Sequence, residues 1–423
     1  MSGRELSTPT DISGHGLAAV HATYAKWLGK KYDLEALDVV LSAAAAESMA
    51  GDPPWLLLIA GSGAAKTETV IPLIGAGAHV VSTISGEAGL LSGTAQKERA
   101  KDATGGLLKK IGDSGLLIIK DFTSILSMNR DTRALILAAL REIHDGHWSR
   151  DIGGEGGRTL NWDGRLVIIG ACTTAWDSAH QVIATMGDRF LLVRPRISDR
   201  RAAGCQAMRN VSSEVTMREE LAASTGKLLA AVTATGRIKL SEAEEDVIYD
   251  VADLITRTRS PVERDYKGEP LFAHALEVPT RLAKELVQLV RGGLALGMTR
   301  PAAMRVLERC AADTMPPMRF KVLVDVASNP NSSTADVVKR LQIPRKTVDR
   351  TLQELHLLEL LVVDEVQAGQ FTRWIYTVAG NVSTDVLDRL AGNVSRGTED
   401  DADPDADPDA DISGQGLGED PAA

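Results

Sequence analysis

The sequence predicts an α/β protein, and three observations carry this prediction. An apolar strand at 56–59 runs into a loop of small residues, and a helix-compatible segment follows at once. Two further apolar runs, 115–119 and 166–172, read as buried strands, and polar residues follow each of them. Between 200 and 312 the chain is rich in helical periodicity and lacks strand signals. An α/β core followed by a helical region is therefore expected.

The loop after the first strand has the composition of a phosphate-binding loop. Small residues separate the strand from a Lys-Thr pair, and a helix follows. In such a loop the backbone N–H groups converge on phosphate oxygens and the helix dipole adds positive potential. The lysine reaches the β- and γ-phosphates, and the threonine hydroxyl ligates Mg²⁺. The sequence thus predicts an ATP·Mg²⁺ site with the nucleotide-binding residues Ala60, Gly61, Ser62, Gly63, Ala64, Ala65, Lys66 and Thr67.

Two alanines distinguish this loop from the G-x-x-x-x-G-K-[ST] pattern. Ala60 and Ala65 stand where glycines are expected, and a Cβ narrows the loop and restricts positive φ. The alternative is a small-residue turn that happens to contain Lys-Thr. The order of strand, loop and helix favours nucleotide binding, whereas the alanines argue against fast hydrolysis.

Composition bounds the class of protein. At 423 residues and 44% apolar content, the chain is long enough for two or three domains with sizeable cores. The net charge of −10 belongs to a tail, because residues 398–423 hold ten acids and no base while residues 1–397 carry 47 of each.

Cys172, Cys205 and Cys310 are widely spaced, which argues against a disulfide framework or a zinc site. No apolar run approaches a membrane span, so a soluble cytoplasmic protein without a membrane partner is expected.

Polar residues at the ends of two later strands are the next candidates. Asp121 follows the run 115–119, and an acid in this position holds Mg²⁺ beside a phosphate loop. The alternative is an Asp that caps the next helix, which has the same sequence signature. Thr173 and Thr174 end the strand at 166–172. Their hydroxyls suit either the γ-phosphate and attacking water or the cap of a following helix.

The order of these elements, completed by Asp-Arg-Phe at 188–190 before an apolar strand, resembles the AAA+ ATPases, especially their DNA helicase and helicase-related members. The resemblance covers about residues 51–380. It implies that Arg189 is a finger that reaches the ATP of a neighbouring subunit, so that the active species is a homo-oligomeric ring. An ion pair within the chain is the alternative for Arg189. The resemblance also implies that Arg281, at the start of a lid helix, touches the γ-phosphate.

The catalytic base is the weak point of this resemblance. Phe122 follows Asp121 where many motor ATPases carry a glutamate. Recombinase-type ATPases place their glutamate after the second strand, which points to Glu87 in this chain. The other alternative is that the base is absent and that the protein is a slow nucleotide switch.

Residues 313–380 resemble a winged helix-turn-helix, which implies DNA as a partner. Helical segments are followed by two alternating runs, 360–365 and 371–378, that suit a two-stranded wing. Use of the module for protein contacts is the alternative, because its net charge is small. The predicted DNA-binding residues are four at the start of the recognition helix and one on the wing: Arg345, Lys346, Thr347, Arg350 and Arg373.

The predicted organisation has five parts: a helical N-terminal extension (1–50), a P-loop ATPase core of AAA+ type (51–199), a helical lid (200–312), the winged helix (313–380), and a linker with a disordered acidic tail (381–423). This arrangement is similar to uncharacterised ATPases of phages and mobile elements. It implies an ATP-dependent DNA-binding motor or remodeller, such as a helicase or helicase loader in DNA replication. The competing class is a nucleotide-sensing winged-helix transcriptional regulator. The tail either masks the winged helix or recruits a protein partner.

Overall fold

The structure, a computed structural model, describes residues 15–92, 105–152, 158–179, 188–232, 238–368 and 371–399. A five-stranded parallel sheet lies at its centre, with the strand order β2-β3-β6-β1-β7. The predicted α/β class is therefore confirmed. The strands are β1 (Trp55–Ile59), β2 (His79–Val81), β3 (Ser114–Ile119), β6 (Arg165–Cys172) and β7 (Phe190–Val193).

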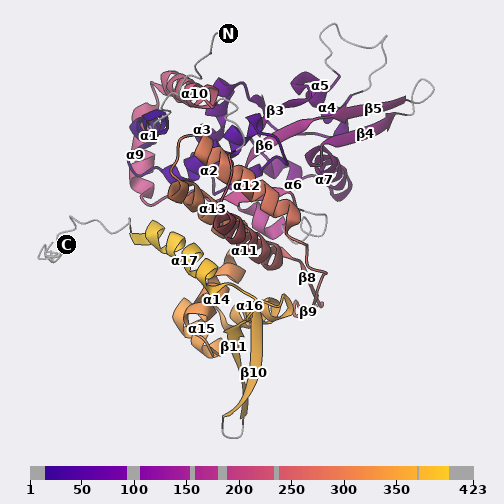
Figure 1. Ribbon diagram of the computed structural model, residues 1–423, viewed down its shortest axis with the longest axis vertical. Coiled ribbons are helices and arrows are strands. Elements are labelled where there is room, and N and C mark those ends of the chain that lie inside the picture. Colours follow the sequence, from indigo (N-terminus) through magenta and orange to yellow (C-terminus); the bar gives the residue numbers. More distant parts are fainter. Residues whose placement is uncertain are drawn as a thin grey trace, which may run out of the picture.

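Helices cover both faces of the sheet (Figure 1). One face packs against α1 (His15–Leu28), α2 (Leu34–Ala45), α10 (Glu214–Ala230), α12 (Thr280–Ala295) and α13 (Arg300–Thr314). The other face packs against α4 (Glu87–Leu90), α5 (Leu107–Ile111), α6 (Thr123–Leu126) and α7 (Arg130–His144). A two-stranded hairpin, β4 (His147–Ile152) and β5 (Arg158–Asp163), projects from this second layer.

Side chains of β1 alternate between these two layers, as the period of a strand requires. Trp55, Leu57 and Ile59 belong to the cluster that contains α7, whereas Leu56 and Leu58 belong to the cluster that contains α2. All five side chains are buried, and β6 and β7 pair with β1 on its two edges. The strand that leads into the phosphate loop is thus held on both edges and both faces.

The N-terminal extension consists of two helices with a tight connection. α1 ends where Gly29 adopts a φ of 98°, a left-handed value that glycine accepts without strain. The side chain of Asp33 then caps α2 by accepting a hydrogen bond from the backbone N–H of Ala36 at 3.0 Å. The chain therefore turns between Gly29 and Asp33.

The lid region contains a β-hairpin, so the expectation that residues 200–312 lack strands is wrong. Its helices are α9 (Arg200–Asn210), α10, α11 (Glu242–Arg259), α12 and α13, and the hairpin strands are β8 (Val262–Arg264) and β9 (Pro270–Ala273). Strands of this length are too short to show an alternating pattern. The Asp265 carboxylate closes the turn by accepting hydrogen bonds from the backbone N–H groups of Lys267 and Glu269, both at 2.8 Å.

The C-terminal unit consists of three helices and a two-stranded antiparallel hairpin (Figure 1). One buried apolar cluster extends from the sheet through the lid into this unit. The unit is therefore packed onto the lid by a shared core. Its elements are α14 (Pro317–Ser328), α15 (Thr334–Leu341), α16 (Arg345–Leu357), β10 (Leu361–Ala368) and β11 (Phe371–Val378).

A further helix, α17 (Thr384–Glu399), occupies part of the segment expected to be linker and disordered tail, so that expectation is wrong for these residues. Val386, Leu387 and Leu390 are buried in the cluster that α13 and α14 share, and this burial stabilises the helix. The acidic repeats of the predicted tail, 400–423, lie outside the described residues. None of the helices in the described ranges combines the length and apolar character that a membrane crossing requires.

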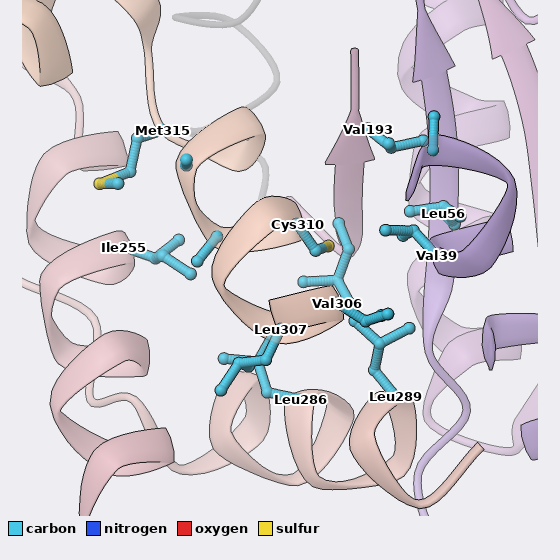
Figure 2. Close-up of a cluster of buried hydrophobic side chains, with 14 of the residues drawn as sticks. Val39, Leu56, Val193, Ile255, Leu286, Leu289, Val306, Leu307, Cys310 and Met315 are labelled. Carbon is cyan, nitrogen blue, oxygen red and sulfur yellow. The ribbon is translucent and has the colours of Figure 1, made fainter. Parts of the chain in front are cut away.

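Helix α13 lies between strand β7 of the sheet and the lid helices α11 and α12 (Figure 2). Val306, Leu307 and Cys310 of α13 belong to one cluster with the strands β1 and β7 on one side and with α11 and α12 on the other. Figure 2 shows Leu56 of β1 on the sheet side of α13 and Leu289 of α12 on the lid side. The position of the lid relative to the sheet therefore depends on α13.

A buried ion network reinforces this position. The Arg309 side chain of α13 is 1% exposed, and its guanidinium lies 2.8 Å from Asp313 and 3.0 Å from Asp33. It also donates to the carbonyl oxygen of Arg194, after β7, at 2.7 Å. Burial disfavours the charged guanidinium, but Asp313 and Asp33 outweigh burial and raise the pKa of Arg309. One side chain thus joins α13 to the start of α2 and the end of β7.

Replacement of this arginine is expected to destabilise the whole fold. Arg309→Met should lower the free energy of unfolding by about 3–5 kcal/mol, because it leaves Asp33 and Asp313 buried without their counter-charge. Urea denaturation checks this value. The matched control is Arg300→Met on the same helix, where a half-exposed pair with Glu244 should contribute less than about 1 kcal/mol. Equal losses for the two variants would contradict the central role of Arg309.

Candidate functional site

The predicted phosphate loop connects β1 to α3 (Lys66–Val70), which continues into a 3₁₀ helix at Ile71–Ala76. Gly63 and Ala65 adopt φ values of 80° and 51°. Ala65 therefore holds a left-handed conformation that costs an alanine about 1–2 kcal/mol. A Cβ at Gly61 or Gly63 would meet no atom within 4 Å. The loop is thus open, and the alanine adopts the positive φ that the sequence made doubtful.

Lys66 is bound back onto its own loop. Its ammonium donates to the carbonyl oxygens of Ala60 at 2.7 Å and Gly61 at 2.6 Å. Partial burial lowers the pKa of Lys66, while the charge of Asp121 acts in the opposite direction. The two side chains are therefore close enough to interact through their charges. Thr67 is exposed in the first turn of α3.

The carboxyl ends of β3 and β6 bring the other candidates to the same edge of the sheet. The Asp121 carboxylate accepts hydrogen bonds from the Ser124 hydroxyl and from the Ser124 backbone N–H at 3.3 Å. The backbone N–H of Thr173 donates to the Thr123 hydroxyl at 2.9 Å. Asp121 thus makes the contact of a helix cap, and its charge also acts on Lys66. Thr174 is exposed at the same strand end.

One interpretation of the catalytic base names Glu87, and the other leaves the base absent because Phe122 follows Asp121. Phe122 is fully buried and packs edge-on against Trp176 and Phe190. Glu87 is the first residue of α4, and its carboxylate lies 4.0 Å from the Arg150 guanidinium of β4. The residue after Asp121 is therefore a core residue, and Glu87 faces the β4 strand.

Arg189 and Arg281 lie together at the junction of the core and the lid. Arg189 is 3.5 Å from the half-exposed carboxylate of Asp145, within the same chain. Arg281 donates to the carbonyl oxygen of Asp188 at 2.9 Å and pairs with Glu277. Both arginines have partners in the chain. The Nε of Arg189, however, is buried without a hydrogen-bond partner among the described residues.

A buried histidine completes the junction. His144, at the end of α7, lies 3.1 Å from the Glu285 carboxylate of α12, and both side chains are 2% exposed. Burial disfavours the imidazolium, but the nearby charge of Glu285 outweighs it and raises the pKa of His144. A buried ion pair therefore ties the lid to the core.

A cavity of about 670 Å³ adjoins the phosphate loop. Gly63, Ala64 and Ala65 form one side of it. The end of α1, its connection to α2, the segment 195–199 and helix α9 form the others. Sequence reasoning missed the lining residues outside the loop because they come from distant segments, and the Lys-Lys pair at 30–31 was the available signal. Six cations and two acids line the cavity: Lys26, Lys30, Lys31, Arg196, Arg201 and Arg209, with Asp33 and Asp199.

The predicted DNA-binding residues lie on α16 and β11. Arg345 and Lys346 are exposed at the start of α16, and Thr347 is half-buried. Arg350 pairs with the Glu269 carboxylate of β8–β9 at 2.8 Å. The last candidate, Arg373 of β11, pairs with Asp336 in the capping box of α15.

No family model and no curated protein matches this chain. Among solved structures it is similar to the apo structure of the NrS-1 C-terminal region (305–718), with 10% sequence identity and a TM-score of 0.30. The match covers 86% of this chain and 76% of the other. A likeness this weak assigns neither fold nor activity, so the function must be argued from the residues of this chain.

The His144–Glu285 pair should make stability depend on pH. A raised pKa adds stability that is fully present below the usual histidine value of about 6.5 and is lost as pH rises through the folded-state pKa. The melting temperature should therefore fall more steeply across this range for the wild type than for His144→Gln. Calorimetry at several pH values checks this difference. His147→Gln, on exposed β4, is the control; an unchanged slope in His144→Gln would contradict the assignment.

Proposed function

We propose that the chain binds ATP·Mg²⁺ at the phosphate loop and couples this binding to action on DNA, as a motor or remodeller such as a helicase or helicase loader. The observation that carries the proposal is the cationic cavity beside the loop. Its volume of about 670 Å³ lies within the usual range for small-molecule sites. An anionic ligand that touches the phosphate loop is the occupant that this lining favours.

The charges of the cavity support an anionic ligand. Asp33 is engaged by Arg309, and Asp199 caps α9. Four of the cations make no ion pair within the described part of the chain: Lys30, Lys31, Arg201 and Arg209. The cavity therefore carries uncompensated positive charge, which attracts phosphate groups.

The apolar lining supports a nucleotide over a simple anion. Leu28, Tyr32, Pro195 and Ile197 line the same cavity. A base and ribose in the cavity would place the phosphates across the loop, toward the Lys66 ammonium. The ammonium would then exchange its two loop carbonyls for phosphate oxygens.

Two oxygen donors at the sheet edge fit a magnesium ion. Thr67 offers a hydroxyl and Asp121 a carboxylate, and Mg²⁺ binds through few protein oxygens together with phosphates and water. The described residues hold no cluster of three or more His, Cys, Asp or Glu suited to a metal. The ion would therefore bind with the nucleotide, where it would neutralise phosphate charge.

Hydrolysis is proposed to need a second subunit. Phe122 supplies no base. Arg189 has a long contact to Asp145, and its buried Nε has no acceptor among the residues that the structure describes. A neighbouring ATP would offer phosphate oxygens to this guanidinium. A ring of subunits is the proposed assembly.

The DNA part of the proposal rests on the C-terminal unit. Its helices α14, α15 and α16 precede an antiparallel hairpin, the order of a winged helix-turn-helix. Arg345 and Lys346 are exposed at the start of α16, where a recognition helix meets DNA.

The second candidate, a nucleotide-sensing transcriptional regulator, is favoured by one observation. The residue after Asp121 is a buried phenylalanine in an aromatic cluster, so the core is built without a carboxylate at this position. A nucleotide would then be held and sensed without being hydrolysed quickly.

Nucleotide binding should depend on the loop lysine and on the cavity. Lys66→Ala should abolish ATP·Mg²⁺ binding in titration calorimetry, and Arg201→Glu should weaken it about tenfold by reversing a charge in the cavity. Lys227→Ala, on exposed α10, is the control and should bind as the wild type does. Wild-type protein without affinity for ATP at millimolar concentration would refute the proposed site.

Turnover should require an intact loop and an intact finger in neighbouring subunits. Arg189→Ala and Lys66→Ala should each be inactive in an ATPase assay with DNA. A mixture of the two variants should regain part of the activity, because some interfaces combine the intact Lys66 of one subunit with the intact Arg189 of its neighbour. Subunit exchange is verified with labelled protein. Full activity of Arg189→Ala alone would refute the proposed role of Arg189 as a finger. Absence of ATP turnover in the wild type would favour the second candidate function, a transcriptional regulator.

A further inference from the structure

The β8–β9 hairpin of the lid covers the first half of α16. Figure 1 shows the hairpin beside this helix, and its strand β9 packs against it. Glu269, which precedes β9, holds two cations of α16. Its carboxylate lies 2.8 Å from the Arg350 guanidinium and 3.5 Å from the Lys346 ammonium. One acidic side chain thus engages two of the residues proposed to bind DNA.

The turn of the hairpin is shaped around Arg350. The guanidinium also donates to the carbonyl oxygen of Lys267. Gly268 has a φ of 78°, and a Cβ there would lie 3.3 Å from the guanidinium nitrogens. Glycine therefore allows the backbone to approach the arginine closely, with a carbonyl and a carboxylate presented together.

Further along α16, a second acid anchors the base of the hairpin. The Glu354 carboxylate pairs with Arg264 of β8 and, at 2.9 Å, with Arg319 of α14. Arg319 also donates to the carbonyl oxygens of Thr258 at 2.8 Å and Ser260 at 2.7 Å. The base of the hairpin is thus fixed by buried groups.

The contact of the hairpin tip, made by Glu269 with Arg350, is weaker than the ion pairs of Glu354 at the base of the hairpin. Glu269 is 40% exposed and Arg350 is 21% exposed, so water screens their attraction. Tyr266 and Phe272 of the hairpin are also exposed. The tip can therefore leave the helix while the base stays in place.

We propose that the tip of the β8–β9 hairpin and duplex DNA compete for the first half of α16, so that the lid restrains DNA binding by the C-terminal unit. The Glu269 carboxylate and the Lys267 carbonyl occupy the positions in which DNA phosphates would meet Lys346 and Arg350. Arg345 stays exposed, so weak binding remains possible with the hairpin closed. This inference rests on the proposed DNA binding.

The test compares two isosteric substitutions on the same hairpin in the full chain. Glu269→Gln removes the charge that holds Lys346 and Arg350, and Glu263→Gln removes an exposed charge whose partner is His274. Fluorescence anisotropy with a labelled duplex should give about three- to fivefold tighter binding for Glu269→Gln and wild-type binding for Glu263→Gln. Circular dichroism confirms that both variants are folded.

A third variant separates competition from loss of structure. Arg350→Ala breaks the same ion pair from the other side and also removes a phosphate contact, so it should weaken DNA binding and reduce the salt dependence by about one phosphate. Opposite effects of Glu269→Gln and Arg350→Ala support competition. Weaker binding in both would show that the hairpin only stabilises α16, which overturns the inference.

Hydrogen exchange gives a readout without substitutions. Saturation of the wild type with duplex should speed exchange of the backbone amides in 265–269, because DNA displaces the tip. Slower exchange there would mean that the hairpin itself lies against DNA, which overturns the competition and leaves DNA binding intact. Absence of duplex binding by the wild type and by Glu269→Gln at low salt would instead refute the DNA part of the proposed function, and this inference with it.

Discussion

The buried guanidinium of Arg309 is the contact on which the arrangement of core and lid depends. It satisfies Asp33 at the start of α2, Asp313 on its own helix and a carbonyl after β7. A buried arginine requires such acceptors, and the acceptors in turn require the arginine. Three segments that are far apart in sequence therefore hold one geometry. The apolar contacts of α13 with the sheet and the lid reinforce it.

This constraint reaches the cavity beside the phosphate loop. Asp33 lines the cavity and pairs with Arg309. Arg196 also lines the cavity, and it follows closely after Arg194, whose carbonyl oxygen accepts a hydrogen bond from Arg309. A ligand in the cavity would therefore touch the same segments that position the lid. The second tie, His144 with Glu285, lies at the junction where Arg189 and Arg281 find their partners. Core and lid are thus joined by charged side chains at two places.

The β8–β9 hairpin and α17 determine the position of the C-terminal unit relative to the lid. Arg264 of β8 and Arg319 of α14 share Glu354 of α16, and the apolar side of α17 packs on both α13 and α14. The unit therefore cannot turn freely about a linker. Its basic helix faces an acidic residue of the lid, which gives the lid a direct contact to the surface proposed for DNA.

The local sequence was sufficient to predict the elements that depend only on neighbouring residues. Strand β1, the loop that begins at Ala60, the start of α3 at Lys66 and the edge position of Asp121 all follow from apolar runs, small residues and polar residues at strand ends. The helices and hairpin of 317–378 follow from periodicity in the same way. These signals act over a few residues, so they are visible in the chain itself.

Tertiary structure decided what depends on distant partners. The β8–β9 strands are too short to show a period, and the ion pairs that join the hairpin to α16, Arg264 with Glu354 and Arg350 with Glu269, link separate segments. Helix α17 forms because α13 and α14 bury its apolar side. The cavity unites residues near 30, 64 and 201, and the partners of Arg189 and Arg281 come from other elements. Charge pairing and burial across the fold have no local signature, and for this reason only the folded chain shows them.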